Sequence, residues 1–191
     1  YWAYSFIFIK DKVSPKDIPF KLNRAQRRVL NKLEKLRKAG KPIKFILLKA
    51  RQWGGSTLVQ IYMLWIMLVH RRNWNTVICG DVETQSRNVR AMITKALNKY
   101  PSYLLGETVK FTPFEGSSKN KVIQNTNCVV SIGSFQKPDT LRSGDISGAH
   151  LTEIGLWRAT PGKKPEDLIQ SISGSIYDTA YTILGLESTA K

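Results

Sequence analysis

The sequence predicts one α/β domain, covering residues 1–191, whose mainly parallel central sheet is flanked by helices. Two observations support this fold class: apolar strand-like runs alternate with helical patterns, and 191 residues suit a single core. The first pair is a helix from Leu22 to Ala39, which Gly40 and Pro42 end, followed by a buried strand from Ile43 to Leu48. Residues 1–20 precede it as an aromatic and irregular N-terminal extension.

The alternation of helix and strand continues along the chain. We expect further helices over Ser56–Val69 and Glu83–Tyr100, and further strands over Asn75–Gly80, Ala149–Ile154 and Tyr181–Leu186. The apolar run from Leu58 to Val69 is shorter than the ~20 residues that span a bilayer, so it predicts a buried helix and no membrane partner.

The middle of the chain has a different pattern. Thr108–Phe114 and Lys121–Ser134 resemble antiparallel strands, and a polar turn over Glu115–Asn120 separates them. We therefore expect an antiparallel hairpin or edge on the otherwise parallel sheet.

The charge of the chain suggests a polyanionic partner. Thirty Lys and Arg residues against fourteen Asp and Glu residues give a net charge of +16, and a domain this basic usually meets nucleic acid. The alternative is a solvated basic surface without a partner. Cys79 and Cys128 have no Cys or His at metal-ligand spacing, so we expect buried free thiols rather than a zinc site. His70 and His150 are interpreted as structural.

The segment Lys49–Thr57, KARQWGGST, has the position of a phosphate-binding loop. It follows the first predicted strand and begins a helix, where backbone N–H groups and the helix N-terminus can hold phosphates. Gly54 and Gly55 let the backbone approach an anion, and Ser56 is placed to bind Mg²⁺. Against the Walker A pattern G-x-x-x-x-G-K-[ST], Lys49 replaces the first Gly and Gly55 replaces the Lys. An ordinary strand–turn–helix junction is the alternative.

This loop resembles the deviant phosphate loop of the large terminase subunits of tailed phages. In some of these families the lysine stands at the front of the loop, followed by Arg-Gln, a variable residue and Gly. The resemblance implies ATP as ligand, with Lys49 reaching the β- and γ-phosphates and Arg51 as a second cation. Gln52 and Thr57 complete the nucleotide-binding set that it implies.

An acidic strand end is the second element that a phosphate loop requires. Glu153 follows the predicted strand that contains His150, and it resembles the Walker B glutamate that activates the attacking water. The family has Asp before this Glu, whereas this chain has Thr152, whose hydroxyl can bond a magnesium-bound water but brings no charge. Asp145 and Asp81 are the candidates for supplying that charge. A surface carboxylate at a strand end is the alternative for Glu153.

Three further segments resemble terminase motifs. Arg142, just before the acidic strand, matches an arginine finger that reaches the neighbouring subunit's nucleotide. Ser188 and Thr189, after the last predicted strand, match the coupling motif that senses the γ-phosphate. Gln26, with Phe20 nearby, resembles the adenine-binding element, because an amide can pair with the adenine edge while a ring stacks on it. A loop arginine and a helix-surface glutamine are the alternatives.

The order of these motifs is typical of P-loop NTPases of the ASCE type, which have an added strand between the two nucleotide motifs and a catalytic Glu. The resemblance implies an ATPase motor that moves double-stranded DNA into a procapsid, using ATP and Mg²⁺. It implies a ring on the portal protein, the small terminase subunit as partner, and a place in the host cytoplasm at the portal vertex. The family's C-terminal nuclease is absent from these 191 residues, so we expect no DNA cleavage.

Two other functions remain open from the sequence. One is a helicase-like DNA translocase that acts outside packaging. The other is an inactive module that binds nucleotide or DNA without turnover, which Gly55 and Thr152 favour.

Overall fold

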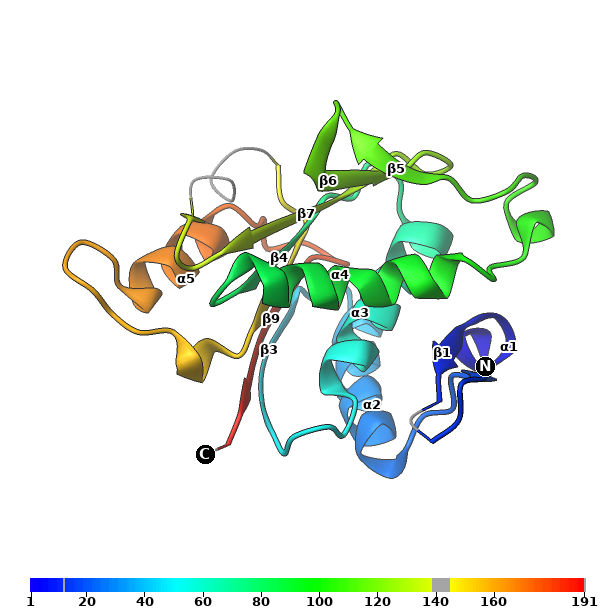
Figure 1. The fold of residues 1–191 in the computed structure, drawn as a ribbon, viewed down its shortest axis with the longest axis horizontal. Coiled ribbons are helices and arrows are strands. Elements are labelled where there is room, and N and C mark those ends of the chain that lie inside the picture. Colours follow the sequence, from blue (N-terminus) through cyan, green and yellow to red (C-terminus); the bar gives the residue numbers. More distant parts are fainter. Residues whose placement is uncertain (12, 139–144, 191) are drawn as a thin grey trace.

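The computed structural model describes residues 1–11, 13–138 and 145–190, and a seven-stranded sheet forms its centre (Figure 1). The strand order is β3 (Ile43–Lys49), β9 (Ile183–Thr189), β8 (Gly148–Thr152), β4 (Thr76–Gly80), β7 (Cys128–Ser134), β6 (Ser117–Ile123) and β5 (Phe111–Phe114). Neighbours from β3 to β7 pair in parallel, and β6 and β5 add antiparallel pairs at one edge. The predicted fold class is confirmed.

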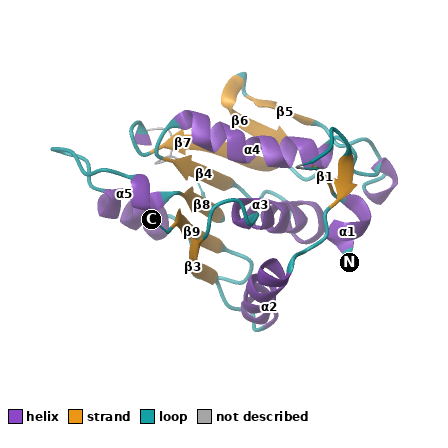
Figure 2. Ribbon diagram, turned by 60° about the horizontal axis from the view of Figure 1, so that its bottom comes forward, coloured by secondary structure: helices purple, strands orange, loops and turns teal. Residues whose placement is uncertain are grey.

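Helices cover both faces of this sheet (Figure 2). One face carries α2 (Arg24–Lys38), α3 (Gly55–Trp65) and α4 (Glu83–Leu97), and the other carries α5 (Pro165–Gly174). Strand alternation assigns the two faces: Ile78 packs into the larger core with the first three helices, whereas Val77 and Cys79 pack into the smaller core with α5. Side chains of the parallel strands therefore serve two separate cores.

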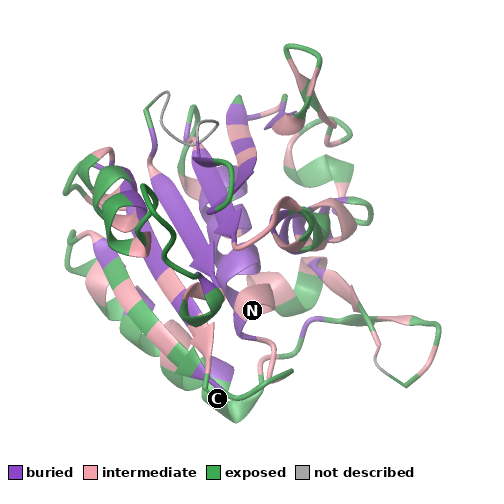
Figure 3. Ribbon diagram, turned by 60° about the vertical axis from the view of Figure 1, so that its left-hand side comes forward, coloured by how far each residue is buried: buried purple, intermediate pink, exposed green. Residues whose placement is uncertain are grey.

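Burial falls from the middle of the sheet to its β3 edge (Figure 3). Every residue of β4 and β8 is buried, as expected for parallel strands covered on both faces. In β3, by contrast, Ile46 and Leu48 are 77% and 71% exposed. Those two side chains lie on the face that α5 covers only farther along the sheet.

The apolar run expected to be a buried helix forms α3 and a following π-helical turn over Ile66–His70. All residues from Leu58 to Leu64 are buried, so the helix lacks the polar face of a surface helix. Its one polar member in that run is Gln60, whose amide lies 2.6 Å from the ring nitrogen Nδ1 of His150. The next helix, α4, ends at Leu97, before the expected Tyr100.

Two expectations for the middle of the chain are wrong. Lys121–Ser134 is not one strand but parts of β6 and β7, which a turn over residues 124–127 separates; Asn127 closes it with a φ of 51°. The expected polar turn over Glu115–Asn120 is also too long. Only Glu115 and Gly116 form the turn, with φ values of 48° and 73°, and β6 begins at Ser117. Because β6 begins with the polar run SSKNK, it lacks the hydrophobic alternation that identifies a strand.

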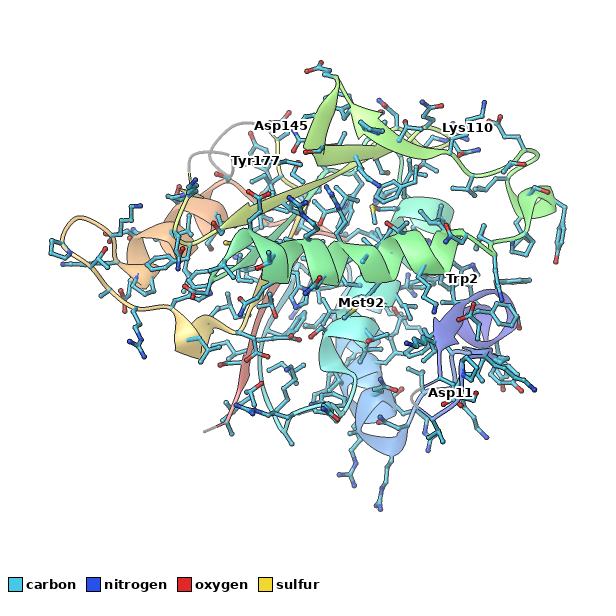
Figure 4. The ribbon with its side chains drawn as sticks, in the orientation of Figure 1. Trp2, Asp11, Met92, Lys110, Asp145 and Tyr177 are labelled. Atoms are coloured by element: carbon cyan, nitrogen blue, oxygen red, sulfur yellow. The ribbon has the colours of Figure 1, made fainter. Side chains whose placement is uncertain are left out.

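The N-terminal extension is more regular than expected. It forms α1 (Trp2–Phe6) and a two-stranded sheet of β1 (Phe8–Lys10) and β2 (Asp17–Pro19). The carboxylate of Asp17 pairs with Lys95 and Lys99 of α4 and its C-terminal extension at 2.7 and 3.0 Å. Trp2, labelled in Figure 4, donates its ring N–H to the hydroxyl of Tyr100 at 3.2 Å. Long-range contacts, which a local pattern does not encode, therefore order this segment.

The remaining elements are short. Ser102–Leu104 and Ile154–Leu156 form 3-10 turns, and α5 begins with Pro165 in its first turn, where proline is favoured. No helix of residues 1–11, 13–138 or 145–190 is long and apolar enough to cross a membrane. Cys79 and Cys128 are buried free thiols, as expected.

Candidate nucleotide-binding site

Three neighbouring strand ends bring most of the predicted site residues together. β3 ends at Lys49, β9 ends at Thr189, and β8 ends at Thr152, immediately before Glu153. In the parallel register Lys49 lies opposite Thr189, and Thr152 lies opposite Glu187. β9 therefore separates the phosphate-loop strand from the acidic strand, which is the added strand that the motif order predicted. The carboxyl ends of parallel strands are the usual ligand-binding edge.

The loop after β3 reaches α3 through two residues with left-handed backbone. Gln52 has a φ of 61°, and Gly54, the N-cap of α3, has a φ of 85°. Gly54 also lacks room for a side chain, because a Cβ there would lie 2.6 Å from Nε2 of Gln26. That amide donates to the Gly54 carbonyl at 2.9 Å, and Asn23 Nδ2 donates to the Trp53 carbonyl at 3.0 Å. The start of α2 thus fixes the loop at the N-terminus of α3.

The side chain of Lys49 explains the glycine at position 55. A Cβ on Gly55 would lie 2.8 Å from Cδ of Lys49, far inside normal contact. The Lys49 side chain, only 7% exposed, runs past Gly55, so a lysine at 55 would clash with it. The loop therefore has room for one lysine, and this chain places it at the end of β3.

Glu153 meets Lys49 at the mouth of the site. The Lys49 ammonium donates to Glu153 Oε1 at 3.0 Å, and Thr189 donates its hydroxyl to the same oxygen at 2.9 Å. The Thr189 backbone N–H donates to Oε2 at 3.1 Å. Burial acts to raise the pKa of Glu153, but these bonds from Lys49 and Thr189 outweigh it, and the pKa lies below its ordinary value. Glu153 is therefore ionised at neutral pH.

The backbone of Glu153 adopts a rare conformation. Its φ of 54° and ψ of 41° are left-handed, directly after the last residue of β8. Such strain costs on the order of 1–3 kcal/mol in a residue with a side chain and persists where surrounding contacts hold it. The turn aims the carboxylate at Lys49 and Thr189 instead of continuing the strand.

A second carboxylate, which the sequence analysis did not select, lies beneath the loop. Glu187 of β9 is fully buried, and its Oε1 accepts the hydroxyls of Ser56 and, at 3.0 Å, Thr152. Lys49 Nζ lies 3.7 Å from Oε1, and His150 Nε2 lies 3.4 Å from Oε2. Burial acts to raise the pKa of Glu187, but the proximity of His150, Ser56 and Lys49 outweighs it and lowers the pKa to about 2. An acid inside the apolar strand ILGLEST was the signal for this residue.

A cavity of about 300 Å³ opens at these strand ends. Its lining includes Lys49, Glu153 and Thr189, together with Arg51 and Gln52 from the loop. A cation, a carboxylate and hydroxyl donors thus share one solvent-accessible space beside the phosphate loop.

A larger cavity, of about 630 Å³, lies on the other side of the loop, between it and the N-terminal hairpin. Phe20, Gln26, Gly54 and Thr57 are among its lining residues. The Thr57 hydroxyl lies 3.7 Å from the sulfur of Met92, which Figure 4 labels beneath α4. Thr57 therefore lines this second cavity, rather than the one that Glu153 lines.

Gln26 contacts the protein at both ends of its amide. Its Oε1 accepts the backbone N–H of Asn23 at 2.9 Å in a capping box, and its Nε2 donates to Gly54. Gln26 is also 4% exposed. In this conformation it connects α2 to the loop, so pairing with adenine would require these bonds to exchange.

Ser188 and Thr189 differ from their expected setting, because both belong to β9 instead of following it. The Ser188 hydroxyl accepts the N–H of Gly155, just beyond Glu153, at 3.1 Å. Arg142 lies outside the described residues. The carboxylate that contacts Ser56 and Thr152 is Glu187, and not Asp81 or Asp145.

These features define a P-loop NTPase fold: a phosphate loop after an edge strand of a parallel sheet, and an acidic residue after the strand two places away. More particularly, the fold is that of phage large terminase ATPase domains. The structure of the HK97 bacteriophage large terminase is similar to 97% of this chain, with a TM-score of 0.72 and 23% identity. This chain spans 36% of that protein.

Other similar structures come from thermophilic phages. The ATPase domain of the Thermus phage P74-26 large terminase has a TM-score of 0.55 and 14% identity over 90% of this chain and 66% of its own. The large terminase of another thermophilic bacteriophage, in complex with ADP, has a TM-score of 0.57 and 12% identity over 88% of this chain and 39% of its own. No protein-family model and no curated protein sequence matches the chain.

Proposed function

We propose that this chain is the ATP-hydrolysing motor domain of a viral DNA-packaging terminase. The observation that carries the proposal is the cluster of Lys49, Glu153 and Thr189 on three adjacent strand ends, around a cavity beside the phosphate loop. The similar fold of the thermophilic phage terminase whose structure contains ADP supports ATP as the ligand. Because the chain spans about a third of the HK97 protein, activity of the whole motor is part of the proposal.

In this mechanism the loop and Lys49 hold the phosphates, and Glu153 activates water. The N-terminus of α3 and the Lys49 ammonium balance the phosphate charge. Glu153 is ionised, 24% exposed and on the cavity wall, so it is able to accept the proton of an attacking water. Mg²⁺, when bound with ATP, neutralises developing charge, and the Ser56 hydroxyl is its expected protein ligand. Arg51 and Gln52, also on the cavity wall, are assigned to phosphate contact.

Subunit contacts and coupling complete the proposed cycle. Arg142 would reach the nucleotide of an adjacent subunit in a ring on the portal protein, and add positive charge at the γ-phosphate. Thr189 donates two hydrogen bonds to Glu153, and Ser188 accepts one from Gly155. Any displacement of Glu153 by the γ-phosphate would therefore be transmitted to β9. The small terminase subunit, and a location at the portal vertex in the host cytoplasm, belong to the same proposal.

Double-stranded DNA is the proposed substrate of translocation. The net charge of +16 supports a polyanionic partner, and α2 presents an exposed basic face that could contact DNA or a neighbouring subunit, formed by Arg24, Arg27, Arg28, Lys32 and Lys35. Lys and Arg contacts to phosphates are independent of sequence and weaken with salt. We expect residues 1–191 to move DNA without cutting it.

A comparison of ATP turnover with DNA alone, and with DNA plus portal-bearing procapsids, tests this proposal. A packaging motor predicts Mg²⁺-dependent turnover that rises most when procapsids are present, with DNA becoming resistant to nuclease. Equal stimulation by DNA alone would indicate a helicase-like translocase. Nucleotide binding without turnover under every condition would indicate an inactive module.

A further inference from the structure

The carboxylate of Glu187 joins the two hydroxyls that a magnesium site of this kind would use. Ser56 is the loop hydroxyl expected to bind Mg²⁺, and Thr152 occupies the strand position where the family has Asp. Both donate to one oxygen, Oε1 of Glu187, with the Thr152 bond at 3.0 Å. Because β9 lies between β3 and β8, with Thr152 opposite Glu187, the acid is one strand nearer the loop than the family position.

The burial of Glu187 calls for a functional explanation. Its side chain is fully buried, and an ionised carboxylate in the protein interior costs several kcal/mol, on the order of the desolvation of one ion, unless partners offset it. Lys49, at 3.7 Å, is shared with Glu153, which it approaches more closely at 3.0 Å. The second oxygen, Oε2, has no hydrogen-bond partner among the described residues, although His150 Nε2 lies 3.4 Å away. Glu187 therefore carries more negative charge than its neighbours offset.

We propose that Glu187 takes over the magnesium-holding role of the missing strand-end aspartate. It would hold the ion beside Ser56, directly or through a bound water, while Thr152 and His150 position its carboxylate. Mg²⁺ prefers carboxylate and hydroxyl oxygens, and usually binds through one or two protein carboxylates together with substrate phosphates and waters. Gln60, 2.6 Å from His150 Nδ1, fixes the orientation of that ring. This inference rests on the proposed nucleotide-binding function.

Nucleotide affinity with Mg²⁺ and with EDTA tests the proposal. In the wild type we expect a non-hydrolysable ATP analogue to bind more tightly with Mg²⁺. Glu187→Gln removes the charge and keeps the shape, so roughly a 10- to 100-fold part of the Mg²⁺-dependent gain should disappear, as for other residues that support a metal. Affinity in EDTA should stay unchanged. Adding Thr152→Asp to this variant restores a carboxylate at the family position, and should recover part of the gain.

A matched control and a metal readout on the wild type complete the test. Glu34→Gln alters another partly buried carboxylate, paired with Arg37 at 2.7 Å, and should leave the Mg²⁺ dependence unchanged. With ¹³C-carboxyl labels on Asp and Glu, Mn²⁺ bound with the analogue should relax the Glu187 signal most strongly, which requires no substitution. Stronger relaxation of Asp81, Asp145 or Glu153, or an unchanged Mg²⁺ dependence in folded Glu187→Gln, would overturn the inference. A wild type that binds no nucleotide would instead refute the proposed function.

Discussion

The ends of β8 and β9 each carry a glutamate, and the two are held in opposite ways. Glu153 leaves β8 through a left-handed turn and lies on a cavity wall, with 24% of its side chain exposed. Glu187 remains within β9 and is fully buried among hydroxyls and His150. An exposed carboxylate can meet a water molecule, whereas a buried and fixed one suits a constant electrostatic role. The difference teaches that neighbouring acids in one site can take separate tasks because of their surroundings.

Lys49→Met should have the largest effect, because Lys49 contacts both glutamates, at 3.0 and 3.7 Å. Methionine keeps much of the length of the side chain but leaves two carboxylates without their cation. Removing one partner of a buried ion pair costs about 3–5 kcal/mol. We expect a loss of this size in the free energy of unfolding, measured by urea denaturation, and no measurable ATP binding. A stable variant that still binds ATP would contradict the shared role of Lys49.

Thr152→Val should have the next largest effect, and should act on Glu187 alone. The substitution preserves shape and removes the 3.0 Å hydrogen bond to a buried charge. Bonds to charged groups contribute about 1.5–3 kcal/mol, so stability should fall by that amount. The Mg²⁺-dependent gain in nucleotide affinity should fall as well. Equal loss of affinity in EDTA would show that Thr152 does not act through a metal.

Thr189→Val is the matched change on the other side of the comparison. It removes the 2.9 Å hydroxyl bond to Glu153 and leaves the backbone N–H bond in place. Because Glu153 is partly exposed, we expect a smaller cost in stability, about 1 kcal/mol. Steady-state kinetics should show a lower kcat for ATP with little change in KM. If KM rises instead, Thr189 contacts the nucleotide and not only Glu153.

Gln26→Ala should have the smallest effect. Gln26 connects α2 to the loop through Asn23 and Gly54, so the variant loses part of a capping box and one loop bond. We expect about 1 kcal/mol less stability by thermal denaturation. A parallel comparison of ATP with GTP binding separates two roles. Similar weakening of both nucleotides indicates that Gln26 supports the loop, whereas loss of ATP preference indicates adenine contact.

The sequence predicts the parallel part of this fold well, because strong apolar runs and helical spacing are local signals. It fails for β6, whose polar residues give no alternation, and for the N-terminal hairpin, which Lys95 and Lys99 hold through Asp17. The same distinction holds for the site. The loop and Glu153 are recognisable from order and spacing, whereas the role of Glu187 depends on β9 lying between β3 and β8. Strand order across a sheet is a long-range property.

The most direct test of the central claim is ATP hydrolysis by the wild type and Glu153→Gln at high protein concentration, with Mg²⁺ present. The substitution keeps the side chain's shape and removes its ability to accept a proton. We predict turnover in the wild type, and a loss of roughly 10²–10⁴-fold in the variant, the usual contribution of a general base, with ATP binding retained. Equal turnover by both proteins would contradict the assignment of Glu153, and with it the proposed site.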